Sequence, residues 1–118
     1  MRVLGVAAIA AAAALALAGQ ALADPMQSFY GNSVRITYPN GQQATLQVEQ
    51  GGAYKLKLPD GTEAAGVWAI EGDQFCTTRM TPAPAPKQCR PAMARAVGDK
   101  WDEDSPNGKV SYEMVAGQ

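Results

Sequence analysis

Cys76 and Cys89 are the residues of this chain best suited to chemistry, and they lie near the two ends of the segment FCTTRMTPAPAPKQCRP, residues 75–91. Redox-active pairs usually place their thiols two residues apart, whereas twelve residues lie between these two. The spacing favours a structural disulfide over a redox centre. Closing the loop would stabilise the fold by about 3 kcal/mol in the chain-entropy model.

Metal and acid–base chemistry have few candidate residues. The chain contains no histidine, which excludes Ser-His-Asp and Cys-His catalysis and histidine-rich zinc or copper sites. The segment DEDSPNG, residues 102–108, is similar to a calcium loop, but Pro106 occupies a ligand position and the glycine comes one residue late. Met80 and Met93 each follow a cysteine by four residues, and this set would suit Cu(I) only if the thiols were reduced. Carboxylates in exposed turns are usually solvated, so we expect no metal, no cofactor and no enzymatic activity.

The loop between the cysteines is the strongest candidate for a binding surface. Alternating alanine and proline restrict it to an extended path, and several basic residues make it locally positive. A stiff loop held at both ends loses little entropy on docking, so we hypothesise that it binds a partner protein. The alternative is an exposed connection whose prolines resist proteolysis and whose charges are solvated. The natural partner for these charges within the chain is the acidic segment 99–104, and pairing with it would make the charges structural. The candidate partner-binding residues are Arg79, Pro82, Pro84, Pro86, Lys87 and Arg90.

The first residues predict export. MRVLGVAAIAAAAALALAGQALADPMQ begins with one arginine, continues as an apolar run and ends in small residues, the pattern of a cleavable signal peptide over residues 1–23. The run is short for a membrane span of about 20 residues. Gln20 stands where a lipoprotein would carry its lipidated cysteine. We therefore expect no stable membrane insertion after cleavage, and a location in the periplasm or outside the cell, where disulfides persist.

The remaining residues, 24–118, suit a single small domain. The chain has ten basic and eleven acidic side chains, which gives no reason to expect nucleic acid as a partner. A domain of this size buries only about 60% of its surface on folding and is marginally stable, so a disulfide would matter.

Period-two alternation and turn residues predict an all-β domain. Alternating segments lie at 33–39, 44–50, 53–59, 63–70, 74–79 and 109–115, and weaker ones at 90–97 and 98–103. No helical period follows the leader, although residues 26–30 could form one turn. We predict an antiparallel meander of seven or eight short strands, curled into a small up-and-down barrel or a strongly curved sheet.

The alternation also predicts which side chains form the core. Because Phe75 belongs to the inward set, Cys76 would lie on the outer face, and the disulfide would pin the loop across the outside of the sheet. The predicted inward residues are Val34, Ile36, Leu46, Val48, Tyr54, Leu56, Leu58, Trp68, Ile70, Phe75, Trp101, Val110, Tyr112 and Met114.

The segments GNSVRITYPNGQQATL, YKLKLPDGTEAAGVWAIEGDQFCTT, VGDKW and PNGKVSYEMV resemble small uncharacterised exported proteins of proteobacteria. Those proteins share a Gly-x-Trp strand, a Gly-Asp turn and two cysteines. The resemblance implies the β-rich fold and the disulfide, and it implies no activity.

A narrower resemblance runs from Gly66-x-Trp68 to the last hairpin and is to the periplasmic inhibitors of secreted metalloproteases, small β-barrels with one disulfide. Here the Gly-x-Trp follows three predicted strands instead of opening the barrel, and the cysteines are closer together. The periplasmic lysozyme inhibitors are also disulfide-bearing β-barrels of this size, but their Ser-Gly-rich motif is missing.

Together these features predict an exported, non-enzymatic β-domain that binds a protein, or associates with the envelope, through the disulfide-closed loop. One alternative is an inhibitor of a periplasmic or secreted hydrolase. Another is a small-ligand carrier, which would need an apolar cavity lined by Trp68 and Trp101.

Overall fold

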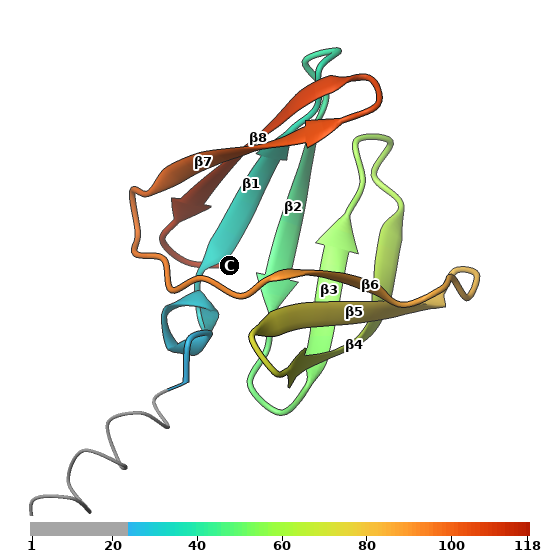
Figure 1. The fold of residues 1–118 in the computed structure, drawn as a ribbon. Coiled ribbons are helices and arrows are strands. Elements are labelled where there is room, and N and C mark those ends of the chain that lie inside the picture. Colours follow the sequence, from blue (N-terminus) through green and yellow to red (C-terminus); the bar gives the residue numbers. More distant parts are fainter. Residues whose placement is uncertain (1–23) are drawn as a thin grey trace, which may run out of the picture.

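The computed structural model describes residues 24–118, and the predicted signal peptide, residues 1–23, lies outside them. The prediction of an antiparallel all-β domain is confirmed (Figure 1). The elements are the 3-10 helix η1 (Gln27–Phe29) and the strands β1 (Ser33–Thr37), β2 (Gln43–Val48), β3 (Ala53–Lys57), β4 (Glu63–Glu71), β5 (Gln74–Thr81), β6 (Gln88–Pro91), β7 (Lys100–Ser105) and β8 (Gly108–Val115).

The strands form one sheet in the order β6-β5-β4-β3-β2-β1-β8-β7. Strands β1 to β6 are a meander, and the terminal hairpin of β7 and β8 returns so that β8 pairs with β1. This leaves β6 and β7 as the two edges of the sheet. The sheet curls into a half-barrel, so the strongly curved sheet is the architecture found (Figure 1).

Cross-strand register brings the apolar residues onto the concave face. Val34 of β1 pairs with Leu46 on one side and with Met114 on the other, and Leu46 pairs in turn with Leu56. Because alternate residues of a strand share one face, such rows build a continuous apolar surface. The core therefore lies inside the curl of the sheet.

Most of the predicted inward residues lie in or against this core. Two of the predicted residues lie outside the core cluster. Tyr54 is buried but does not belong to the cluster, and Leu58 is half-buried and follows the last residue of β3. The core also contains Met26, which precedes η1, and Phe29, the last residue of η1, and neither was predicted. Both come from a segment too short to show a periodic pattern.

The sixth strand is shorter and earlier than the segment 90–97 predicted for it. It spans Gln88–Pro91, and its partner is β5, with Cys89 directly opposite Cys76. Proline has no backbone N–H to donate to a ladder, so Pro91 suits the last position of an edge strand. Residues 92–99 then connect β6 to β7 without forming a strand.

Within residues 24–118, no helix has the length and apolar character needed to cross a membrane.

Candidate functional site

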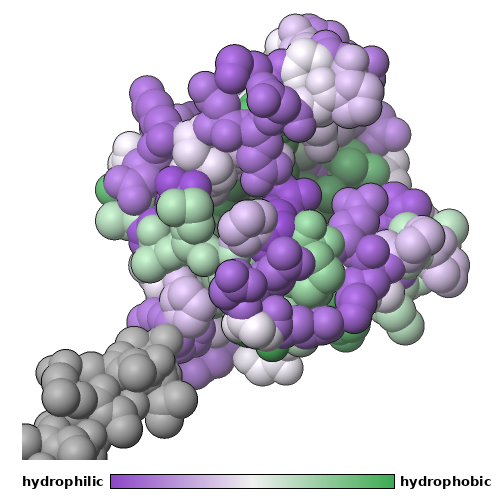
Figure 2. Space-filling view, viewed as in Figure 1, coloured by the Kyte–Doolittle hydropathy of each residue, from purple (hydrophilic) through white to green (hydrophobic). Residues whose placement is uncertain are grey.

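A cavity of about 590 Å³ occupies the concave interior of the half-barrel. Its volume lies within the range of about 300–1,000 Å³ typical of ligand pockets. Every strand except β4 contributes to its wall, together with η1 and the connections on either side of β6. In Figure 2, hydrophilic residues cover much of this side of the molecule, and strongly hydrophobic residues are visible at depth between them.

The floor of the cavity is apolar because the inward residues of the central strands form it. Val34 and Val48 are buried, and Phe29 of η1 packs in the same cluster. Tyr54 of β3 also lines the cavity, and burial raises the pKa of its phenol although the Arg79 cation acts to lower it. The Tyr54 side chain is therefore an uncharged part of the wall at neutral pH.

The edge strands β6 and β7 stand on the two sides of the cavity opening and do not pair with each other, but side chains connect them. Arg90 of β6 donates from Nη1 to Glu103 Oε1 of β7 at 2.8 Å and to the Tyr112 hydroxyl of β8 at 3.2 Å. The Tyr112 hydroxyl itself donates to Glu103 Oε1 at 2.9 Å. Burial raises the pKa of Tyr112, with the Arg90 cation lowering it and Glu103 raising it. The alternative prediction, that loop charges pair with the acidic segment 99–104, is confirmed for Arg90.

Two further arginines line the cavity. Arg79 of β5 donates from Nε to the carbonyl oxygen of Ala83 at 3.0 Å. The Arg95 guanidinium lies 4.1 Å from the centroid of the Trp101 ring, a cation–π geometry, and Trp101 stacks on Tyr112 at 5.5 Å between centroids. Among the described residues, neither Arg79 nor Arg95 forms an ion pair with a carboxylate.

The prediction that both tryptophans would line a carrier cavity is half right. Trp101 lines it, whereas Trp68 does not. The Trp68 ring packs beside Tyr30 and Phe75, and its indole N–H donates to the Glu49 carbonyl at 2.8 Å. A hydrogen bond to the β2–β3 turn holds the ring against the core, away from the open space.

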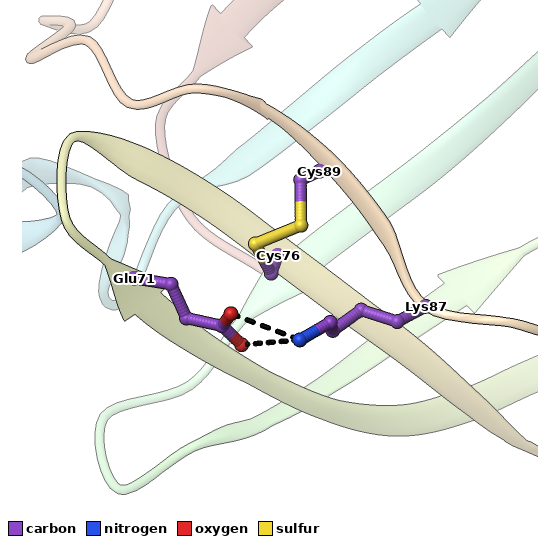
Figure 3. The surroundings of a disulfide bond; sticks show 4 residues. All are labelled: Glu71, Cys76, Lys87 and Cys89. Atoms are coloured by element: carbon purple, nitrogen blue, oxygen red, sulfur yellow. Dashed lines mark hydrogen bonds and ion pairs between the residues drawn. A yellow bond between two sulfur atoms is a disulfide. The ribbon is translucent and has the colours of Figure 1, made fainter.

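The disulfide joins Cys76 and Cys89 across the neighbouring strands β5 and β6 (Figure 3). Phe75 and Thr77 line the cavity while Cys76 between them does not, which places the disulfide on the outer side as expected. Cys76 is nonetheless buried, and Cys89 on the edge strand is exposed. Lys87 lies beside the disulfide and its Nζ donates to both carboxylate oxygens of Glu71, at 2.9 and 3.0 Å (Figure 3).

The six predicted partner-binding residues therefore separate into groups. Arg79, Pro86 and Arg90 line the cavity. Pro82 and Pro84 are exposed in the loop and do not line it, and Lys87 is occupied by Glu71.

Sequence reasoning placed Phe75 inside but missed Thr77 and Arg79, which continue the cavity wall along β5. Thr77 faces the interior because it stands two residues from the inward Phe75. The same alternation places Arg79 inside. Arg79 was predicted only as a partner-binding residue of the loop, although the sequence already contained this alternation. Arg95 lies beyond the second cysteine, and nothing local in the sequence indicates that it stacks on Trp101.

Within residues 24–118, no three histidine, cysteine, aspartate or glutamate side chains are grouped so that they could hold a metal ion. Comparison of the chain with protein-family models, with curated proteins and with solved structures finds no match. The resemblances to exported β-proteins and to protease inhibitors stay predictions.

Proposed function

We propose that this domain is a non-catalytic binding protein that takes an apolar ligand into the interior of the half-barrel. The observation that carries the proposal is the cavity of about 590 Å³, whose floor is apolar and whose wall also includes a smaller number of polar and charged side chains. Ligand pockets combine these two features, since apolar walls supply affinity and a few polar groups supply orientation. Each Å² of apolar surface that the ligand removes from water contributes about 25 cal/mol.

The disulfide-closed loop has a defined role in this proposal, as one wall of the site. Ala85 and Pro86 line the cavity. The Ala85 N–H donates to the Arg79 carbonyl at 3.1 Å, and Arg79 Nε donates back to the Ala83 carbonyl. A wall that is already ordered loses little entropy when the ligand binds.

We also propose that the protein acts in the periplasm or outside the cell. The disulfide suits an oxidising compartment, and the first 23 residues have the pattern of a signal peptide.

Two neighbouring threonines of β5 allow a matched test. Thr77 lines the cavity, and Thr78, the next residue, does not. Thr77→Trp would place an indole in the ligand space, while Thr78→Trp adds the same group to the other face of the same strand. Binding of the neutral apolar fluorophore N-phenyl-1-naphthylamine to the oxidised protein is measured by fluorescence, and circular dichroism checks that each variant is folded.

We expect the wild-type protein and Thr78→Trp to bind the fluorophore, and Thr77→Trp to lose at least about tenfold in affinity because the indole occupies its space. A wild-type protein that does not bind the fluorophore would contradict the proposal. So would equal binding by the two folded variants.

A second candidate function is protein binding by the exposed part of the loop, and inhibition of a hydrolase is one form of it. The observation in its favour is that residues 82–84 are exposed while the disulfide and the Lys87–Glu71 ion pair hold the loop. Residues 82–86 are replaced by Gly-Ser of equal length, and both proteins are used to capture partners from an envelope extract. A partner, such as a hydrolase, that only the native loop captures supports this function. Capture of the same proteins by both versions would contradict this second function.

A further inference from the structure

The inner face of the cavity carries more positive than negative charge at its rim. Arg79, Arg90 and Arg95 line the cavity, and Glu103 pairs with only one of them, Arg90. Asp102 also contributes to the lining, but its side chain alternates with those of Trp101 and Glu103 and so belongs to the outer face of β7.

The guanidinium groups of Arg79 and Arg95 retain hydrogen-bonding capacity. Arg79 uses Nε on the loop, and its two terminal nitrogens donate to no residue of the described chain. Arg95 stacks its face on Trp101 and donates from Nη2 to Met93 Sδ at 3.6 Å. A guanidinium has five N–H donors in a planar fork that matches a carboxylate or phosphate. Both arginines are held by these contacts and still have donors to offer.

A ligand that fills the cavity would displace water from these donors. Leaving a charged donor without a partner after water is removed is unfavourable, so a purely apolar ligand would be penalised at the rim. A ligand with acceptor oxygens at one end would replace the lost water. The charge of those oxygens would have to be negative to complement the arginines.

We propose that the ligand is a single-chain amphiphile whose apolar tail fills the cavity and whose anionic head, a carboxylate or a phosphate, is bound by Arg79 and Arg95 at the rim. A cavity of about 590 Å³ lies within the range of pockets that hold one small ligand, which favours a single chain over two. This inference rests on the proposed function of apolar ligand binding and specifies the chemistry of the ligand.

The test compares ligands that share a tail and differ in the head. Dodecanoate, dodecyl phosphate and dodecanol are titrated calorimetrically into the oxidised protein below their micelle concentrations. Wild-type protein is expected to bind at least one of the two anions about tenfold or more tightly than dodecanol. The tighter of the two identifies the head as carboxylate or phosphate.

The double variant Arg79→Gln/Arg95→Gln is expected to lose about tenfold in affinity for the preferred anion and to bind dodecanol at least as tightly as the wild-type protein, because the cations that penalise a neutral ligand are gone. The matched control is Arg35→Gln, since Arg35 lies outside the cavity lining and pairs with Glu113 at 3.3 Å. This control keeps the wild-type preference for the anion.

Two results would overturn the inference. If wild-type protein binds dodecanol as tightly as both anions, or if the double variant keeps the anion preference, the arginine rim does not recognise an anionic head. Apolar ligand binding would still stand in that case. If wild-type protein binds none of the three ligands and does not bind the neutral fluorophore either, the proposed function fails with the inference.

Discussion

At the scale of single residues, the arginines of the cavity differ in what they contact. Arg90 forms an ion pair with Glu103 in which the side chains are 42% and 37% exposed, so its contribution to stability is about 0.2–1 kcal/mol. Its main effect is to connect β6 with β7 and β8 across the opening. Arg79 and Arg95 contact a backbone carbonyl and an aromatic face instead. These contacts position the cations without neutralising them.

The environment of Tyr30 raises the pKa of its phenol, which makes stability depend on pH. Burial, followed by its hydrogen bond to Asp24 Oδ2 at 2.7 Å, raises the pKa of Tyr30 from 10.0 to about 12. The unfolded chain therefore loses this proton at lower pH than the folded chain. The neutral phenol of Tyr30 therefore contributes to the free energy of unfolding. This contribution is fully present below pH 10 and is lost as the pH rises through about 12.

We expect the free energy of unfolding to fall between pH 10 and about pH 12, and to fall less steeply in Tyr30→Phe, which has no phenol proton to lose. Urea denaturation followed by circular dichroism at a series of pH values measures both slopes. Identical slopes in the two proteins would show that Tyr30 does not contribute.

At the scale of elements, β4 depends on Gly66. A Cβ built at Gly66 would clash with the Thr78 carbonyl oxygen and would lie 2.9 Å from Tyr54 Cε1. The register between β4 and β5 shifts at this point, because Ala65 pairs with Thr81 and Gly66 pairs with Arg79. Gly66 is therefore the place where a bulge in β5 and the Tyr54 ring of β3 both approach the β4 backbone.

Gly66→Ala is expected to lower the free energy of unfolding by about 1–3 kcal/mol, because the added methyl group meets a backbone oxygen that cannot move aside alone. Urea denaturation measures the loss. Ala69→Ser, which adds one heavy atom at an exposed position of the same strand, is the control and is expected to change stability by less than about 0.5 kcal/mol. A Gly66→Ala protein as stable as the control would contradict this account.

At the scale of the whole molecule, the sheet is open and its two edges are protected differently. β7 carries Lys100, Asp102 and Asp104, and such charges discourage pairing with another chain. β6 is four residues long, pairs only with β5 and ends at a proline. The disulfide joins this short edge strand to its only neighbour.

Cys76→Ala/Cys89→Ala is expected to lower the free energy of unfolding by about 2–4 kcal/mol, because the crosslink spans 13 residues and restricts the unfolded chain. Hydrogen exchange should show the largest loss of protection in β6, and the least in β1 and β2, which are paired on both sides. Calorimetry or urea denaturation measures the first effect. Uniform loss of protection through all strands would show that the disulfide does not act on the edge specifically.

Several features of the fold could be predicted because they are local. Alternation in Val34 and Ile36 indicates an inward face, and Phe75 inward implies Cys76 outward, whatever the rest of the chain does. The site was less accessible to this reasoning. The basic and proline residues of the loop were identified, but which of them face the interior depends on how β5 continues past Thr77 and how the loop returns beside it.

The sequence by itself determined the all-β class and the pairing of its only two cysteines, together with most of the inward face, because each follows from neighbours a few residues apart. Only the tertiary structure decided that β8 returns to pair with β1 and that β6 and β7, which do not pair with each other, are the two edges of the sheet. It also decided that Arg90 of β6 reaches Glu103 of β7. The physical reason is that a cavity and its rim are made by residues distant in the chain, and their meeting depends on the curvature of the whole sheet.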